Sequence, residues 1–287
     1  MRGEPGPVRI AGWRRWRRLT AGVAVIAFVL ASGCTAAGST AGGRIFEFNI
    51  YGNRGAERSV NVSMATELAQ TLDARNPLPF AIALQEVCES LKDRILPDLT
   101  GRRYTVSWWM PVWVGTNPDG SNCGWYGNLI AVKAVAGDSV HRNYTNQIGE
   151  IRSYICLNAP DENIGQWVCS THLRNGDVTT ASSQLVEFMD DINQLDGVKS
   201  FGADLNLSTM PSSSEFAPGL AGQFCAGGYD EADSESCETL SQRPTLDSGR
   251  AKLDYVGLQK DRLQPLPPAR ISPSNNSDHH VYEGFAR

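Results

Sequence analysis

Apolar runs that end in a polar side chain recur along this sequence, and this pattern restricts the fold more than any other feature. Short apolar runs rich in β-branched and aromatic residues are typical of strands. The interior of a sheet disfavours acids, amides and histidines, although any one of them alone is ordinary as a loop cap or surface residue. Several of them on separate strands indicate a shared site at the strand ends. The residues are Asn49, Glu86, His172, Asp204, Asn206, Asp254, Asp278 and His279.

The periodicity of the chain after residue 44 predicts a mixture of strands and helices. Apolar spacing predicts helices over 59–74 and around 185–195, and an irregular stretch over 208–249. Strands are predicted over 45–50, 80–87, 104–114, 128–133, 152–157, 166–173, 199–205, 252–258 and 279–285. Because several of these strands are neighbours in hairpins, the pattern favours an α/β sandwich over a simple doubly wound sheet. Asp204 and Asn206, two residues apart, are expected to project from the same face of one strand.

Charge is distributed unevenly along the chain. Residues 1–33 carry six arginines and one acid, whereas the remaining 254 residues carry 20 basic and 30 acidic side chains, a net charge of −10. This excess of acids disfavours a partner held by bulk positive charge. A nucleic acid would have to be held locally, through metal ions and a few arginines.

The N-terminal segment has the features of an export signal. A basic region is followed by the apolar run 21–31 and by small residues before Cys34. The sequence Leu30-Ala31-Ser32-Gly33-Cys34 resembles a bacterial lipobox, which predicts lipidation of Cys34, although Ala31 stands where leucine is more usual. Cleavage by ordinary signal peptidase and a permanent anchor helix are the alternatives. The predicted organisation is a signal over 1–33, a flexible tether over 34–43 and one catalytic domain over 44–287.

Six cysteines remain if Cys34 carries lipid, and an even number in an exported chain indicates three disulfide bonds. Spacing favours Cys225–Cys237, which would close a short loop rich in glycine and acids. It also favours Cys156–Cys169 across a hairpin, which leaves Cys88–Cys123. A zinc site is the alternative, but the sequence contains no pair of cysteines separated by two residues.

The ordered set of polar motifs resembles the endonuclease/exonuclease/phosphatase superfamily, which includes pancreatic-type deoxyribonuclease. The motifs are Asn49-Ile50-Tyr51-Gly52, Gln85-Glu86, Thr171-His172, Asp204-Leu205-Asn206, Leu253-Asp254-Tyr255 and Ser277-Asp278-His279. They follow the order of the family and cover essentially the whole domain. The resemblance implies a four-layer α/β sandwich, in which two packed mixed β-sheets are flanked by helices, as in DNase I. One departure is Ala203, where the family normally has glycine, and it is expected to crowd the turn slightly.

The resemblance also implies a role for each of these residues. Glu86 would be the principal ligand of Mg²⁺ or Mn²⁺, with Asn49 and Asp278 nearby, since hard oxygen ligands suit these ions. Asp204 would orient or deprotonate the attacking water, and Asn206 would bind the phosphate or the water. His279, fixed by Asp254, would be a general base or a phosphate ligand. His172 would stabilise the phosphoryl oxygens or protonate the leaving group.

Arg152 resembles the phosphate-contacting arginine of the family, but strand alternation raises a difficulty. If Cys156 and Cys169 are directly opposed, Arg152 shares their face of the hairpin and His172 takes the other. A bulge or shifted pairing would be needed to bring both side chains to one site. His141 and His280 are expected to be ordinary surface histidines.

The resemblance, together with the export signal, thus implies an exported, metal-dependent phosphodiesterase, and two signals favour DNA as its substrate. The loop after Asn49 carries Asn53, Arg54 and Arg58, which suit flanking phosphates. The segment with Trp108, Trp109, Trp113 and Trp125 is interpreted as a buried strand rather than a membrane-touching or base-stacking surface. The alternatives are a sphingomyelinase-like phospholipid phosphodiesterase acting on the lipid headgroup, a phosphatase, and a binding protein that has lost catalysis. The chain is expected to be a monomer that meets a membrane only through its lipid.

Overall fold

The computed structural model describes residues 43–50, 58–113, 123–161, 164–234 and 236–287, which belong to one compact unit. The helices in this part of the chain are α1 (Arg58–Asp73), α2 (Glu89–Gly101), α3 (Val178–Asn193) and α4 (Leu220–Gly227). The strands are β1 (Gly43–Asn49), β2 (Ala81–Cys88), β3 (Thr105–Trp113), β4 (Trp125–Val132), β5 (Ser139–Asn143), β6 (Ser153–Asp161), β7 (Gly165–His172), β8 (Lys199–Asp204), β9 (Tyr229–Glu231), β10 (Asp254–Gln259), β11 (Arg270–Ser272) and β12 (Val281–Ala286).

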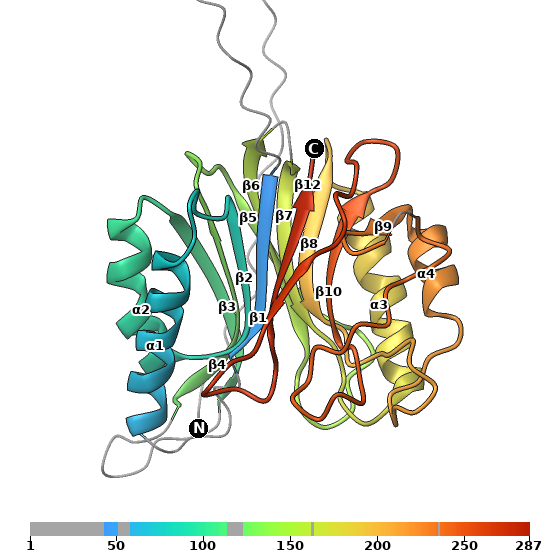
Figure 1. Cartoon of the computed structure of the whole chain (residues 1–287), viewed down its shortest axis with the longest axis horizontal. Helices are drawn as coiled ribbons and strands as arrows, with labels where there is room; N and C mark the ends of the chain where they lie inside the picture. The colour runs from blue at the N-terminus through green and yellow to red at the C-terminus, as the bar shows by residue number, and fades with distance from the viewer. Residues whose placement is uncertain (1–42, 51–57, 114–122, 162–163, 235) are drawn as a thin grey trace, which may run out of the picture. The chain divides into compact units, whose positions relative to one another are not determined.

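The strands form two six-stranded sheets that pack face to face. Their strand orders are β11-β12-β1-β2-β4-β3 and β5-β6-β7-β8-β10-β9. In the view of Figure 1, α1 and α2 cover the first sheet on the left, and α3 and α4 cover the second on the right. Both sheets mix parallel and antiparallel neighbours, because β1 pairs parallel with β2 and β7 pairs parallel with β8. The predicted four-layer α/β sandwich is therefore confirmed.

Most predicted elements are present, but the sequence did not reveal five of those described: α2, α4, β5, β9 and β11. Helix α2 begins directly after β2, with Cys88 as its N-cap, and it contains Pro97. Proline has no backbone N–H to donate and is disfavoured inside helices, so a segment that contains it is not readily predicted as helical. Helix α4 lies within the stretch interpreted as irregular, and it is held by burial of Leu220 and Phe224.

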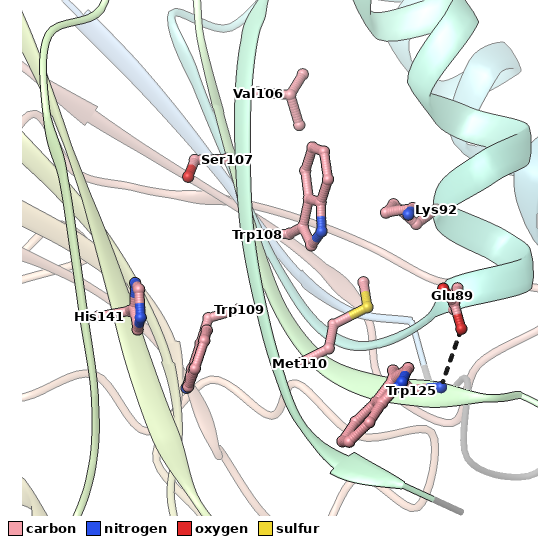
Figure 2. A pocket seen from close by; sticks show the side chains of 9 residues that line it. All are labelled: Glu89, Lys92, Val106, Ser107, Trp108, Trp109, Met110, Trp125 and His141. Carbon is pink, nitrogen blue, oxygen red and sulfur yellow. Dashed lines mark hydrogen bonds between the residues drawn. The ribbon is translucent and has the colours of Figure 1, made fainter. Parts of the chain in front are cut away.

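The interpretation of the tryptophan segment as a buried strand is wrong. Strand β3 lies at an edge of its sheet, and the side chains of Trp108, Trp113 and Trp125 are 41%, 52% and 44% exposed. Figure 2 shows side chains of β3 standing on both sides of the strand, with Trp108 and Met110 on the side of Lys92 and Trp109 on the side of His141. The regular pattern of a strand predicts its existence, but it does not say whether another strand covers its outer edge.

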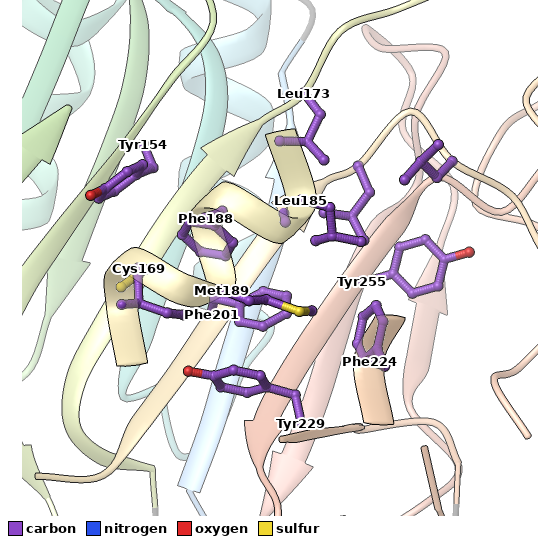
Figure 3. Packing of buried hydrophobic residues seen from close by; sticks show 14 of the residues in the cluster. Tyr154, Cys169, Leu173, Leu185, Phe188, Met189, Phe201, Phe224, Tyr229 and Tyr255 are labelled. Carbon is purple, nitrogen blue, oxygen red and sulfur yellow. The ribbon is translucent and has the colours of Figure 1, made fainter. Parts of the chain in front are cut away.

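The described residues form three apolar cores, one between each sheet and its helices and one between the two sheets. Between the second sheet and its helices, aromatic rings pack edge to face, as for Phe188 and Phe201 with centroids 5.3 Å apart (Figure 3). Tyr229 and Phe224 also contact Phe201, with ring centroids 5.2 Å and 5.9 Å away. This layer fixes the outer face of β8, the strand that ends in Asp204.

The two sheets approach each other closely beside the polar ends of the strands. A Cβ atom at Gly202 would lie 2.7 Å from the Cβ of Ala83 in the opposite sheet, and 3.1 Å from Glu47. Carbon atoms in normal contact are about 3.5–4.0 Å apart, so only glycine fits at residue 202. Ala203 points instead into the core beneath α3 and α4. The small residue that the sheets require is thus Gly202, and the alanine before Asp204 packs as an ordinary core residue.

All three disulfide bonds favoured by the cysteine spacing are present: Cys88–Cys123, Cys156–Cys169 and Cys225–Cys237. Cys156 and Cys169 are directly opposed in the β6–β7 pair. Disulfide bonds form and persist mainly in oxidising compartments outside the cytoplasm. Among the described residues, the structure contains no helix long and apolar enough to cross a membrane.

Candidate active site

The polar residues predicted to share a site come from strand ends that the fold brings to one edge of the sandwich. Asn49 ends β1 and pairs with Gln85 of the parallel neighbour β2. His172 and Asp204 end β7 and β8, which are also parallel and in register. Asp254 begins the antiparallel strand β10 directly opposite Asp204. Because the carboxyl ends of parallel strands lie at the same edge, both sheets contribute side chains to one site.

Glu86 lies at an irregularity in its strand. The pairing of β2 with β4 shifts between Leu84 and Val87, and Glu86 has a backbone φ of 57°. A left-handed conformation is rare for a residue with a side chain, and it is often found where a bulge turns a side chain toward a functional site. Burial raises the pKa of Glu86, whereas the charges of Arg152 and His279 and a hydrogen bond from Asn49 lower it.

One oxygen of Asp204 is the point on which the site converges. Oδ2 of Asp204 accepts a hydrogen bond from Nδ2 of Asn49 at 2.8 Å, and it lies 3.3 Å from Nε2 of His172 and 3.7 Å from Nε2 of His279. Burial and the charge of Asp254 raise the pKa of Asp204 to about 7, although His279 and the hydrogen bonds from Asn49 and Asn206 oppose this shift. A carboxyl with this pKa is suited to accept a proton near neutral pH.

His279 is held by a buried carboxylate. Its Nδ1 lies 3.0 Å from both oxygens of Asp254, and its backbone nitrogen donates to the hydroxyl of Ser277. The same hydroxyl donates to the backbone oxygen of Asn49 at 2.8 Å, which ties this loop to the end of β1. Although burial opposes the charged ring, the carboxylates of Asp254 and Asp204 raise the pKa of His279 to about 10. The ring is therefore an imidazolium at neutral pH and cannot accept another proton.

His172 and Arg152 lie side by side, which resolves the difficulty raised by strand alternation. Strand β6 begins at Ser153, so Arg152 lies outside the regular strand, and its Nη1 is 2.8 Å from Nδ1 of His172. Gln147 fixes the backbone of Arg152 by donating to its carbonyl and accepting from its N–H. Burial and the charges of Arg152 and His279 hold the pKa of His172 well below its usual value. The same guanidinium nitrogen lies 3.2 Å from Nε2, but its contact with Nδ1 is shorter and the acceptor oxygen of Asp204 faces Nε2. We therefore assign the neutral ring a free Nδ1, which accepts from Arg152, and an Nε2–H that points toward Asp204.

Asn206 does not project from the strand of Asp204, so that expectation is wrong. Strand β8 ends at Asp204, and Asn206 has a left-handed φ of 48°. Its backbone N–H donates to Oδ1 of Asp204 at 3.0 Å, and its amide nitrogen donates to the carbonyl of Leu173. The first of these bonds leaves Oδ2 of Asp204 to face the site, so Asn206 orients the carboxylate.

The residues present fit a divalent cation. Oε2 of Glu86 and Oδ1 of Asp278 are buried without a hydrogen-bond partner among the described residues, and an orphaned carboxylate oxygen needs a cation or a donor. Asp204, Asp254 and His279 also offer ligand atoms within 4.8 Å of one another. That second group is less suitable, because His279 is protonated and already bonded to Asp254. The orphaned carboxylate oxygen of Glu86 suits Mg²⁺ or Mn²⁺ better, while Asn49 turns its amide nitrogen toward Glu86 and Asp204.

Sequence reasoning missed two residues in the wall of the site. Tyr126 and Asn128 lie on β4 beside Arg152 and His172. Oδ1 of Asn128 is buried without a hydrogen-bond partner in the described part of the chain, and the buried hydroxyl of Tyr126 lies against Arg152. The signal was a polar asparagine within the apolar run 128–133, which was interpreted only as the start of a strand.

Other sequence predictions fall on residues outside the described ranges. These are the signal segment 1–33, lipidation of Cys34, most of the tether 34–43, and Asn53 and Arg54 of the loop after Asn49. Arg58 begins α1, but its side chain is likewise not described. Of the two other histidines, His280 is partly exposed and pairs with Asp247, and His141 stacks on Trp109.

The chain was compared with protein-family models, with curated proteins and with solved structures. No protein-family model matches the chain, and no curated protein matches it. Solved structures do match. The catalytic domain of human Nocturnin with bound sulfate has a TM-score of 0.63 at 17% identity, covering 86% of this chain and 94% of its own. An endonuclease/exonuclease/phosphatase family protein from Leptotrichia buccalis has a TM-score of 0.62 at 15% identity, covering 85% and 99%. Truncated TDP2 from Caenorhabditis elegans has a TM-score of 0.60 at 17% identity, covering 85% and 96%.

The chain has the endonuclease/exonuclease/phosphatase fold. This confirms the fold that the six ordered motifs predicted. At these identities the comparison establishes architecture alone, so the roles of individual residues rest on the geometry of this site.

Proposed function

We propose that this protein hydrolyses phosphodiester bonds with the help of a divalent metal ion, and that its substrate is DNA. The observation that carries the proposal is the convergence of Asn49, His172 and His279 on Oδ2 of Asp204, within 2.8–3.7 Å. Glu86 and Arg152 lie beside this group, the first with an orphaned oxygen and the second with a buried guanidinium. A site with carboxylates, a buried cation and two histidines has the groups that phosphoryl transfer to water requires.

Each residue has a distinct task in this proposal. Glu86, with Asn49 and Asp278, would hold Mg²⁺ or Mn²⁺, which when bound neutralises charge on the phosphoryl oxygens. Asp204 accepts a proton from the attacking water, because its pKa lies near 7. Of the two roles that the resemblance implies for His279, a general base or a phosphate ligand, its protonated state favours the phosphate ligand.

With substrate bound, the Nε2–H of the neutral His172 would turn from Asp204 to a phosphoryl oxygen, and Arg152 at Nδ1 fixes the tautomer that makes this possible. Its lowered pKa argues against protonation of the leaving group by His172. The leaving oxygen would take its proton from the His279 imidazolium as the P–O bond breaks. Asp254 is a positioning residue, since it holds the His279 ring and keeps it charged. Asn206, predicted to bind the phosphate or the water, also orients Asp204 through its backbone N–H.

The proposal that the substrate is DNA is supported by positive charge within the site and not by the net charge of the chain. Arg152 and the His279 imidazolium provide positive groups where a phosphodiester would bind, although the chain after residue 33 is acidic overall. Among proteins of the same fold, TDP2 from D. rerio was solved with a single-strand DNA product. The cationic loop with Asn53, Arg54 and Arg58 remains a prediction that would add contacts to flanking phosphates.

A phospholipid headgroup is the second candidate, and the exposed tryptophans favour it. Trp108, Trp113 and Trp125 form the kind of surface that a membrane-docking enzyme uses. A substrate panel of supercoiled plasmid, sphingomyelin vesicles and sugar phosphates, each with Mg²⁺, Mn²⁺ or EDTA, separates the candidates. Nicking of plasmid with metal supports the proposal. Release of phosphocholine from sphingomyelin, with the plasmid left intact, would show that the substrate is a phospholipid and not DNA. No turnover of any substrate would indicate a binding protein.

We further infer that the protein is an exported monomer tethered by lipid at Cys34. Three disulfide bonds in the domain support exposure to an oxidising compartment. Mass spectrometry of the mature N-terminus tests the anchor. A diacylglyceryl group on Cys34 supports it, whereas an unmodified N-terminus downstream of Cys34 would show simple secretion.

A further inference from the structure

A groove runs along the outer edge of β3, beside the proposed active site. Its volume is about 630 Å³, and Trp108, Trp109, Met110, Trp125, Glu89 and Lys92 are among the residues that line it. Figure 2 shows the Trp108 and Trp125 rings on the side of α2 together with Met110, Glu89 and Lys92. A concave site of this size, lined by five apolar and four polar or charged side chains, can hold a small molecule or one unit of a polymer.

Three of the tryptophans in and beside the groove present ring surface to solvent. Trp108, Trp113 and Trp125 are 41–52% exposed, and the rings of Trp113 and Trp125 meet edge to face with centroids 5.3 Å apart. Trp109 differs, since it stacks on His141 at 3.8 Å and donates to Oδ1 of Asn143, which joins the edges of the two sheets. Large aromatic rings gain much free energy by burial, so three exposed ones together indicate a binding surface.

The groove is continuous with the wall of the catalytic site on two strands. On β4, Trp125 lines the groove and the next residue, Tyr126, lines the small cavity beside Arg152 and His172. On β3, Met110 lines the groove and the next residue, Pro111, lines that cavity. Successive residues of a strand face opposite sides of the sheet, but the groove opens on both sides of β3, since Trp109 and His141 line it as well. Trp109 lies two residues, or about 6.6 Å, before Pro111 of the cavity, so a polymer bound at the catalytic centre has its neighbouring unit within reach of the groove.

The charge of Lys92 beside the groove favours some classes of ligand over others. The ammonium of Lys92 lies 4.8 Å from the centroid of the Trp108 ring, and it also pairs with exposed Asp93 at 3.0 Å. The ammonium of Lys92 would repel a quaternary ammonium headgroup at this ring and attract a phosphate. It favours an uncharged aromatic ring that carries phosphate. A nucleobase has this chemistry, and stacking on aromatic side chains tolerates any base.

We propose that this tryptophan groove binds an unpaired nucleobase of the substrate strand next to the scissile phosphate. This inference rests on the proposed nuclease function and extends it to the form of the substrate. In a duplex both faces of a base are covered by its neighbours in the stack, so only an unpaired or frayed base reaches a tryptophan face. The groove therefore makes single-stranded or frayed DNA the preferred substrate.

The test compares a single-stranded 12-nucleotide DNA with the same strand in a duplex, using the purified full chain and Mg²⁺. We expect a kcat/KM about tenfold higher for the single strand. Trp108→Ala and Trp113→Ala should each raise the KM for the single strand about tenfold, with a much smaller change in kcat, and Trp108→Phe should restore most of the loss because it keeps an aromatic face. Val186→Ala, which truncates an exposed apolar residue of α3, is the matched control and should behave as the wild type.

A binding measurement separates failure of the groove from failure of the nuclease proposal. In EDTA, single-stranded octathymidylate should quench tryptophan fluorescence of the wild type, and Trp108→Ala should lose most of the quenching. If the tryptophan variants have the same KM as the wild type and the oligonucleotide causes no quenching, the groove does not bind a nucleobase, although the nuclease proposal still stands. Quenching by vesicles of phosphatidylglycerol but not by the oligonucleotide would overturn it in favour of a membrane. No cleavage of either DNA form would refute the nuclease proposal, and quenching lost in Trp108→Ala would still support the groove.

Discussion

Replacing Gly202 by alanine should disrupt the contact between the sheets that brings the two halves of the site together. The added Cβ would lie 2.7 Å from the Cβ of Ala83 and 3.1 Å from Glu47, about 1 Å closer than a normal carbon contact. Both neighbours belong to strands with little freedom to move. Overpacking of this kind costs about 2 kcal/mol, which for a domain of this size lowers Tm by about 4–8 °C.

Activity should fall as well, because the methyl group pushes β8 away from β1 and β2. The 2.8 Å contact between Asn49 and Asp204 crosses this interface two residues from the added group. A displacement of about 1 Å at reacting groups can cost up to about 10²-fold in rate.

Urea unfolding and turnover of bis(p-nitrophenyl) phosphate measure the two effects. Ala83→Gly combined with Gly202→Ala should recover much of both losses, because it removes the opposing methyl group. Gly222→Ala is the matched control. Its Cβ would meet nothing within 4 Å, so it should leave stability equal or slightly higher, as expected for glycine replaced in a helix. If Gly202→Ala unfolds at the same urea concentration as the wild type, the proposed close contact between the sheets is wrong.

Three further predictions concern the charged groups and the disulfide bonds. The pKa of His279, raised to about 10, should keep the ring protonated at pH 8 in metal-free protein, as seen by ¹⁵N NMR; a neutral ring there would contradict the assignment. The stabilising effect of this raised pKa is fully present below about pH 6.5 and is lost as pH rises through about 10, so the stability advantage over His279→Asn should shrink across that range. Thiol counting on native protein processed at Cys34 should find no free cysteine, and loss of Cys156–Cys169 or Cys225–Cys237 should each cost about 3 kcal/mol; two free thiols would be incompatible with the three bonds. His172→Ala and His279→Ala should lower turnover about 10²–10⁴-fold, and activity within threefold of the wild type would remove either ring from the mechanism.

Much of the site could be predicted from sequence because its residues break an apolar pattern. Asn49, Glu86, His172 and Asp204 each stand at the end of a run that otherwise reads as a buried strand, and the fold brings these ends to one edge. Disulfide pairing was predictable for a similar reason, since the short loop and the hairpin left few partners.

Other features depend on contacts that periodicity does not encode. The left-handed backbone of Glu86 and Asn206 follows from a bulge and from the end of β8, and neither has a local sequence signal here. Arg152 reaches the site from a loop held by Gln147, a contact that strand alternation could not reveal. The exposure of the tryptophans on β3 is set by the absence of a further strand beyond it in the described sheet.

The central claim is that Glu86 and its neighbours hold a metal ion that hydrolysis requires. The most direct measurement is nicking of supercoiled plasmid by the purified protein across a Mg²⁺ titration, with Glu86→Gln beside it and the exposed Glu238→Gln as matched control. We expect nicking that EDTA abolishes, and a loss of at least about 10²-fold in Glu86→Gln that high Mg²⁺ partly restores. The control should follow the wild type. Full nicking in EDTA, or a Glu86→Gln variant with the Mg²⁺ dependence of the wild type, would contradict the claim.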